Sequence, residues 1–201
     1  MDSFVAIDFE TACWGVSCAV GIVHFENGEV VEQRYTLIDP GISQRRWDLR
    51  AINVHGITPA DVIGQPTFAD IWPELLHYAS CYPFVAHNAN FDMGVLRSEL
   101  ERFTLQSPSV RFGCSMALAR SAWPRKHPES PENHKLNTLS SFLNISLDHH
   151  NALSDAVAAG MVTLAALDRL GHGSLSAAYS RAGMAWGEIS PELDVLAANK
   201  W

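Results

Sequence analysis

The sequence predicts an α/β fold in which helices flank a mixed β-sheet. Three apolar stretches typical of strands occupy the first 38 residues, and Asn27-Gly28, a pair that favours a tight hairpin turn, separates the second from the third. From residue 84 onward, short apolar stretches alternate with segments of helical periodicity. An antiparallel meander followed by alternating strands and helices indicates an α/β sandwich rather than a barrel or an all-parallel sheet.

The meander is expected to consist of the strands Phe4–Thr11, Ser17–Phe25 and Val30–Ile38. The break at Asp39-Pro40-Gly41 ends it, and an irregular stretch to about His55 is expected to follow. Thr58-Pro59 is a cap-and-proline pair that predicts the start of a short helix.

A longer helix is expected over Phe68–Ala79, with Thr67 as its cap and with Pro73 predicting a kink or a later start. The periodicity of Phe91–Phe103 predicts another helix, with Glu99 and other charged residues largely on its polar side. The remaining expected elements, in chain order, are strands at Phe84–Ala86 and Val110–Cys114, a helix from there to about Trp123, a loop at Pro124–His134, and helices at Leu136–Leu143 and Ala152–Leu170.

At 201 residues the chain fits one domain, which is expected to span residues 1–172. Residues 173–201 are expected to form a tail with one or two helical turns, capped at Ser190-Pro191, that packs on the domain or mediates self-association through Trp186 and Trp201. The chain begins without a basic and apolar leader and has no run of eighteen uncharged apolar residues, so we expect a cytoplasmic protein without a membrane partner. The four cysteines form no CxxC pair, and we expect reduced thiols.

The formal net charge of −8 is unusual for a protein that binds nucleic acid, because phosphate binding normally needs a basic surface. Two bound divalent ions would offset about half of this excess. Two basic clusters either flank a phosphate path or form solvated charged surface: Arg45, Arg46 and Arg50 in the first, and Arg120, Arg125, Lys126 and Lys135 with His127 and His134 in the second.

Two carboxylates end the first expected strand. Asp8 and Glu10 are two residues apart, so their side chains point to the same face of the sheet. Unpaired charge near a core costs roughly several kcal/mol unless cations or hydrogen-bond partners balance it. A pair of metal ions would balance it.

Two further motifs contain candidate functional residues. Asp92 ends Ala86-His87-Asn88-Ala89-Asn90-Phe91-Asp92, where a strand is expected to lead into a helix, and Asp155 ends His150-Asn151-Ala152-Leu153-Ser154-Asp155. Taken alone, each acid has an ordinary structural explanation, because the helix dipole favours a carboxylate in the first turn. His149 and His150, taken alone, could likewise be loop histidines.

Together, the motifs Asp8-x-Glu10-Thr11, His87-Asn88-x-x-Phe91-Asp92 and His150-x-Ala152-x-x-Asp155 resemble, in this order, the DEDDh (DnaQ-like) family of 3′-to-5′ exonucleases, named for four acids and a histidine. The similarity is to the proofreading epsilon-subunit type of bacterial DNA polymerase III. It runs from about Phe4 to Leu170 and includes Val54-His55-Gly56-Ile57-Thr58. The resemblance implies a ribonuclease H-like sheet and release of 5′-mononucleotides from nucleic acid 3′ ends.

By this resemblance, four carboxylates would bind two Mg²⁺ ions, for which Mn²⁺ could substitute: Asp8, Glu10, Asp92 and Asp155. Magnesium prefers oxygen ligands and keeps several waters, so a few carboxylates suffice. Two such ions about 4 Å apart can hold an attacking water and stabilise the leaving 3′ oxygen. Histidine titrates near neutral pH, which suits a general base, and the motif spacing assigns this role to His150 rather than to His149.

The resemblance also implies a set of residues around the 3′-terminal nucleotide: Phe9, Thr11, His55, Asn88 and Phe91. Phe91 could equally belong to the core. Aromatic stacking accepts every base, so trimming without sequence preference is expected.

The leading hypothesis is cleavage of DNA, in single-stranded or frayed form. An alternative is an exoribonuclease on the same site, because only contacts to 2′-hydroxyl groups tell RNA from DNA. A non-catalytic module that binds nucleic acid ends is less consistent with the sequence, because all five signature residues are present. Epsilon subunits carry a C-terminal extension that binds the polymerase, whereas about thirty residues follow Gly171, so polymerase attachment and a homodimer both stay open.

Overall fold

The computed structural model describes residues 3–193 and 195–196. In this part of the chain, seven strands form one sheet in the order β3-β2-β1-β4-β5-β6-β7. Neighbouring strands are antiparallel except for the pairs β1–β4 and β4–β5, which are parallel. The strands are β1 (Phe4–Cys13), β2 (Val16–Glu26), β3 (Glu29–Leu37), β4 (Phe84–Ala86), β5 (Val110–Cys114), β6 (Gly187–Ile189) and β7 (Val195–Leu196). The predicted mixed sheet is therefore confirmed.

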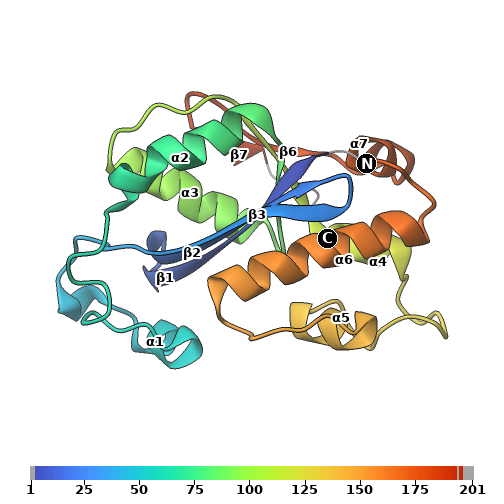
Figure 1. Ribbon diagram of the computed structural model, residues 1–201, viewed down its shortest axis with the longest axis horizontal. Helices are drawn as coiled ribbons and strands as arrows, with labels where there is room; N and C mark the ends of the chain where they lie inside the picture. The colour runs from blue at the N-terminus through green and yellow to red at the C-terminus, as the bar shows by residue number, and fades with distance from the viewer. Residues whose placement is uncertain (1–2, 194, 197–201) are drawn as a thin grey trace.

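Helices cover both faces of this sheet (Figure 1). One layer consists of α2 (Phe68–Cys81) and α3 (Asn90–Arg102). The opposite layer consists of α4 (Ser115–Ala122), α5 (Leu136–Leu143) and α6 (Ala152–Arg169), and α7 (Leu175–Arg181) contributes to the same core.

The alternation along β1 determines which face carries the acids. Val5, Ile7 and Phe9 pack in the core formed with α2 and α3, whereas Phe4 and Ala6 pack in the core formed with α4 and α6. Because successive side chains of a strand point to opposite faces, the acids at positions 8 and 10 continue the row of Phe4 and Ala6. They therefore lie on the α6 side of the sheet.

The segment between β3 and α2 is helical where the sequence predicts irregular structure. A 3-10 turn at Gln44–Arg46 leads into α1 (Leu49–His55). The Asp48 side chain caps α1 by accepting a hydrogen bond from the Arg50 N–H, and Gly56 ends it with a φ of 77°. With only seven residues, none of them buried, α1 has no hydrophobic periodicity that would reveal it.

Of the two helix starts predicted in this region, the one at Thr58-Pro59 is wrong and the one after Thr67 is confirmed. Residues 59–64 form turns, and the Thr58 N–H and hydroxyl both donate to Asp61 Oδ2, which closes a turn instead of capping a helix. α2 begins at Phe68, as the Thr67 cap predicts, and runs through Pro73, so of the two alternatives for Pro73 the later start does not occur. The capping box at Thr67 satisfies N–H groups of the first turn and offsets the hydrogen bond that proline cannot donate.

The tail extends the sheet. It forms α7, but Ser190-Pro191 lies in a turn after β6, so the prediction that this pair caps a helix is wrong. β6 pairs with β5, and the Trp186 ring stacks on Tyr179 of α7 with centroids 4.4 Å apart. Trp201 lies outside the described residues.

Two further observations concern membranes and thiols. In residues 3–193 and 195–196, no helix is long and apolar enough to cross a lipid bilayer. All four cysteines lie in this part of the chain and are free thiols. Cys18 is buried beside β1, whereas Cys81 is exposed at the end of α2.

Candidate active site

Three of the predicted carboxylates come together at one end of the sheet. Asp8 and Glu10 extend from β1, and Asp155 lies in the first turn of α6. Each offers an oxygen atom that lies within 4.8 Å of the others. Glu10 and Asp155 are buried, and Asp8 is partly exposed. A group of oxygen donors this close is suited to a divalent cation.

A glycine in β2 allows α6 to reach these acids. Asp8 pairs with Gly21 across the β1–β2 ladder. A Cβ atom at Gly21 would lie 2.1 Å from the backbone oxygen of Ala152, the first residue of α6. The helix start therefore rests directly on the strand, which brings Asp155, three residues further along, beside Asp8.

Gly21→Ala is expected to push the start of α6 away from the sheet. Overpacking of this kind costs about 1–3 kcal/mol, and the displaced Asp155 would lower the nuclease activity that the motifs predict by about tenfold or more. Thermal unfolding and initial cleavage rates measure the two effects. Gly173→Ala is the matched control, because nothing lies within 4 Å of a Cβ atom there. Equal behaviour of the two variants would contradict this role of Gly21.

Asp92 is the fourth predicted carboxylate and lies deeper. It is only 1% exposed in the first turn of α3, and its Oδ1 accepts a hydrogen bond of 3.1 Å from the Phe9 N–H. This bond ties α3 to β1 between the two acids of that strand. Asp92 is not part of the close group formed by Asp8, Glu10 and Asp155.

The acids raise one another's pKa. Burial first, and then the charges of Asp92 and Asp155, raise the pKa of Glu10 from an ordinary 4.5 to about 8. Burial and the same neighbours raise the pKa of Asp8 well above its usual range. Among the described residues, no lysine or arginine forms an ion pair with any of these carboxylates. Their oxygen atoms are therefore free of competing lysine and arginine side chains in this part of the chain and available to a bound cation.

The metal-free protein is expected to lose stability as the pH rises. Between 4.5 and about 8, the folded state keeps a proton on Glu10 that the unfolded chain releases. The folded state then binds more protons, so the free energy of unfolding falls with rising pH across this window. Thermal unfolding in EDTA between pH 4.5 and about 8 measures this fall in stability. Mg²⁺ is expected to raise the melting temperature most at the alkaline end of this pH range. A melting temperature that rises with pH would contradict this.

His149, rather than His150, makes the side-chain contact with Asp155. The His149 Nδ1 lies 3.0 Å from Asp155 Oδ1, and its ring stacks on that of His150 with centroids 3.8 Å apart. His150 donates its backbone N–H to Asp155 Oδ2 at 3.1 Å, and its side chain is exposed. Partial burial and the neighbouring His149 lower the pKa of His150. Its ring is therefore neutral at neutral pH and able to accept a proton.

An open pocket of about 350 Å³ surrounds the acids. It is lined by Asp8, Phe9, Glu10, Thr11, Arg50, Ala51, Val54, His55, Phe91, His150 and Asp155. Every residue that the sequence predicts for the site lies in this lining except Asp92, which is buried, and Asn88, which is exposed where β4 leads into α3. Phe91 is 38% exposed, so it is a surface residue rather than part of the core. The Phe9 side chain is buried, and only its backbone can face a ligand.

His55 is held rigidly in the pocket wall. Its Nδ1 accepts a hydrogen bond from the Ile57 N–H at 3.0 Å, so its Nε2 carries the proton and donates to the Thr11 carbonyl at 3.1 Å. Burial lowers the pKa of His55, which agrees with a neutral ring. With both nitrogens engaged, the ring offers carbon atoms rather than a hydrogen bond to a bound nucleotide.

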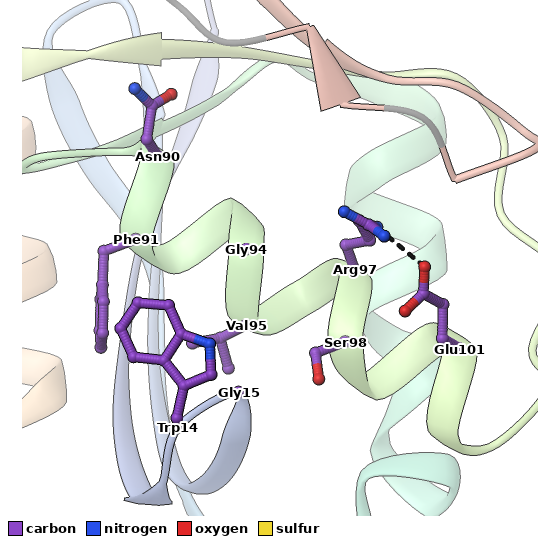
Figure 2. Close-up of a pocket in the computed structure, with 9 residues that line it drawn as sticks. All are labelled: Trp14, Gly15, Asn90, Phe91, Gly94, Val95, Arg97, Ser98 and Glu101. Atoms are coloured by element: carbon purple, nitrogen blue, oxygen red, sulfur yellow. Dashed lines mark hydrogen bonds and ion pairs between the residues drawn. The ribbon is translucent and has the colours of Figure 1, made fainter.

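The sequence did not indicate that Trp14 lines a pocket, and it left open whether Arg50 lies near the acids. Trp14, in the turn between β1 and β2, is 90% exposed and contacts Phe91 edge to face with centroids 6.5 Å apart. The two rings border a second pocket of about 310 Å³ along α3 (Figure 2). Arg50 reaches the acidic pocket because α1 forms, whereas the cluster from Arg120 to Lys135 contributes to neither lining.

The family of the chain follows from its sequence. The sequence profile described as "Exonuclease" matches residues 5–163. The chain belongs to the exonuclease family. It is a DnaQ-like exonuclease, as the order of its motifs predicts. The acidic cluster agrees with the use of divalent metal ions by this family.

Similar proteins include much longer ones. The exonuclease domain is 32% identical over 176 residues to DNA polymerase III PolC-type from Oceanobacillus iheyensis, and the match covers 84% of this chain but 12% of the polymerase. A structure of Exonuclease X in complex with 5′ overhanging duplex DNA is 25% identical, with a TM-score of 0.66, and the match covers 84% of this chain and 93% of that one. The nuclease domain of 3′hExo, a DEDDh family member bound to rAMP, shares the fold at 15% identity, with a TM-score of 0.68 and 98% of both chains covered.

Proposed function

We propose that the chain is a divalent-metal-dependent 3′-to-5′ exonuclease that releases 5′-mononucleotides from single-stranded DNA. The observation that carries the proposal is the meeting of three carboxylates, from Asp8, Glu10 and Asp155, in one open pocket with His150. Carboxylates that can hold metal ions and a neutral imidazole that can accept a proton suit phosphodiester hydrolysis, and the exposed ring of Phe91 can stack on a terminal base.

The residues of the pocket fit divalent cations. All donors of the close group are carboxylate oxygens, which Mg²⁺ prefers, and Mn²⁺ is expected to substitute. Asp8, Glu10 and Asp155 would hold one ion, and Asp8 with Asp92 a second. When bound, the ions would offset the negative charge of the acids and act as Lewis acids toward water and the scissile phosphate.

His150 is the proposed general base. Its lowered pKa leaves the ring unprotonated at neutral pH, and its exposed position at the pocket rim allows it to take a proton from the attacking water. The backbone hydrogen bond to Asp155 fixes the loop that carries the ring. His149 stacks on this ring and holds the Asp155 carboxylate, so we assign it a positioning role.

The walls of the pocket would bind the 3′-terminal nucleotide. Phe9 and Thr11 line the pocket beside the acids, the His55 ring forms one side, and Phe91 offers a face for base stacking. Arg50 would contact a phosphate. Asn88 lies outside the lining, and we propose that it supports the start of α3 through its carbonyl, which accepts from the Phe91 N–H at 2.9 Å.

The choice of DNA draws on the relatives. PolC-type relatives are named DNA polymerases, and the Exonuclease X structure contains DNA. Parallel reactions of 5′-labelled single-stranded DNA, duplex DNA and RNA of one sequence test the choice in Mg²⁺. We expect the single-stranded DNA to shorten fastest. If RNA shortened faster, the proposed substrate would be RNA instead of single-stranded DNA. If no substrate shortened, the proposed exonuclease activity would be contradicted.

The tail is proposed to be an integral part of the enzyme. β6 adds to β5 within the sheet, and Trp186 covers Tyr179. The Tyr179 hydroxyl accepts a hydrogen bond from the backbone N–H of Cys114, at the end of β5. Residues 173–193 therefore support β5. This strand is the neighbour of β4, and β4 is the neighbour of β1, the strand that carries Asp8 and Glu10.

A further inference from the structure

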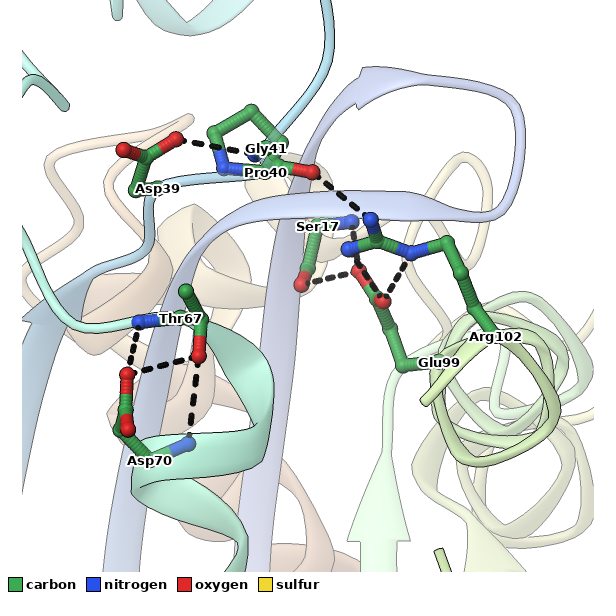
Figure 3. Close-up of polar contacts among 8 residues, drawn as sticks. All are labelled: Ser17, Asp39, Pro40, Gly41, Thr67, Asp70, Glu99 and Arg102. Carbon is green, nitrogen blue, oxygen red and sulfur yellow. Dashed lines mark hydrogen bonds and ion pairs between the residues drawn. The ribbon is translucent and has the colours of Figure 1, made fainter. Parts of the chain in front are cut away.

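The turn between β1 and β2 is fixed to α3 at two successive helix residues. Gly15 has a φ of 72°, and a Cβ atom there would lie 2.7 Å from the Ser98 hydroxyl, so the turn rests directly on the helix. Next to this contact, the backbone N–H and the hydroxyl of Ser17 both donate to Oε1 of Glu99, each at 2.6 Å (Figure 3). These contacts couple the position of the turn to that of α3.

The Glu99 carboxylate is fully buried, although the helical pattern predicts it on the polar side of α3. Its second oxygen, Oε2, accepts from Nε and lies 2.7 Å from Nη2 of Arg102. Arg102 also donates from Nη1 to the Pro40 carbonyl at 2.7 Å. A buried ion pair of this kind is weak support for stability, because apolar residues of similar volume stabilise a fold as well or better. Its geometry points to a positioning role.

The part of the chain that this contact positions is Trp14. The indole is 90% exposed and so contributes little to the core, yet it stands beside Phe91 as one wall of the 310 Å³ pocket (Figure 2). Phe91 lines this pocket and also the acidic pocket, so the two are neighbours across one ring. Phe91 and Asp92 both belong to α3, the helix to which the turn is fixed.

We propose that Glu99, together with Arg102, is a positioning residue for nucleic acid binding. By holding Ser17, it keeps the Trp14 ring beside Phe91, where the ring supports the bases that precede the 3′-terminal nucleotide. This proposal rests on the proposed exonuclease function. It predicts that Glu99 affects oligonucleotide binding only through Trp14.

A double-mutant cycle tests this coupling. In an Asp8→Asn background that prevents cleavage, the Kd of a fluorescein-labelled oligothymidylate in Mg²⁺ is measured by anisotropy for Glu99→Gln, Trp14→Ala and the double variant. Each single change is expected to weaken binding by about tenfold, since one stacked base accounts for a change of this size. The double variant is expected to bind no more weakly than Trp14→Ala. The proposal would be overturned if the double variant weakened binding by the product of the two single factors, or if Glu99→Gln left the Kd unchanged.

Two further variants separate positioning from loss of fold. Ser17→Ala removes one hydrogen bond to Glu99 but leaves its ion pair, and it is expected to weaken binding by a smaller factor that again disappears without Trp14. This variant decides the question if Glu99→Gln does not fold. Arg34→Gln breaks exposed ion pairs with Glu32 and Glu74, far from Trp14 in the sequence, and is expected to leave binding unchanged.

Different results would contradict the proposed exonuclease function and the proposed role of Glu99. A wild-type chain that binds the oligonucleotide without cleaving it would overturn the exonuclease activity, while the binding cycle would still decide the role of Glu99. A wild-type chain that does not bind the oligonucleotide would overturn both.

Discussion

Asp8→Asn is expected to abolish cleavage and, in EDTA, to make the protein more stable than the wild type. Asp8 lies at the centre of the acids, and its oxygen is within 4.8 Å of those of Glu10 and Asp155. At this separation two like charges repel by about 3 kcal/mol at an effective dielectric constant of about 20. Removing one charge relieves this repulsion but also removes a cation ligand. We expect the cleavage rate to fall by about a thousandfold or more.

Two measurements on Asp8→Asn check these opposite effects. The melting temperature in EDTA near pH 8 is expected to rise by about 3 °C or more, and the initial rate of DNA shortening in Mg²⁺ to disappear. Asp168→Asn is the control, because this acid is exposed further along α6. A variant that is less stable than the wild type in EDTA, or that keeps its activity, would show that Asp8 does not belong to a cation site.

His150→Ala is expected to lower kcat by about 100- to 10,000-fold with little change in the melting temperature. The exposed ring makes few contacts that stabilise the fold, whereas loss of a general base typically has a kinetic effect of this size. His149→Ala is the matched comparison, because it removes the neighbouring ring and the contact with Asp155. Loss of such an orienting contact is expected to lower activity by about tenfold.

The pH dependence of the cleavage rate in the two variants also shows which histidine is the general base. The cleavage rate of the wild type is expected to fall on the acidic side as His150 takes up a proton, and this fall is expected to persist in His149→Ala. A larger loss of kcat in His149→Ala than in His150→Ala would assign the base to His149. The motif spacing would then have identified the wrong histidine.

The sequence was sufficient for those parts of the site that depend on local rules. Period-two alternation in β1 predicts that Asp8 and Glu10 share a face, and they do. The family motifs predict Asp155 beside them. The buried position of Asp92 depends on a hydrogen bond to Phe9, 83 residues away, which no local pattern reveals.

Long-range contacts account for what the sequence did not reveal. Gly21 resembles any strand glycine, and its importance comes from the Ala152 backbone that rests on it. Glu99 follows the pattern of a solvent-exposed helix residue, but Ser17 and Arg102 bury it. Trp14 has no periodic pattern at all, and its proposed role comes only from the position of the turn beside Phe91. Each of these roles requires the tertiary structure.

The most direct test of the central claim follows the label released from 3′-end-labelled single-stranded DNA by the wild type and by Asp8→Asn. The wild type in Mg²⁺ is expected to release the label first, as a 5′-mononucleotide, and EDTA or Asp8→Asn is expected to prevent release. Release that persists in EDTA, release that begins at the 5′ end, or equal release by Asp8→Asn would contradict the central claim.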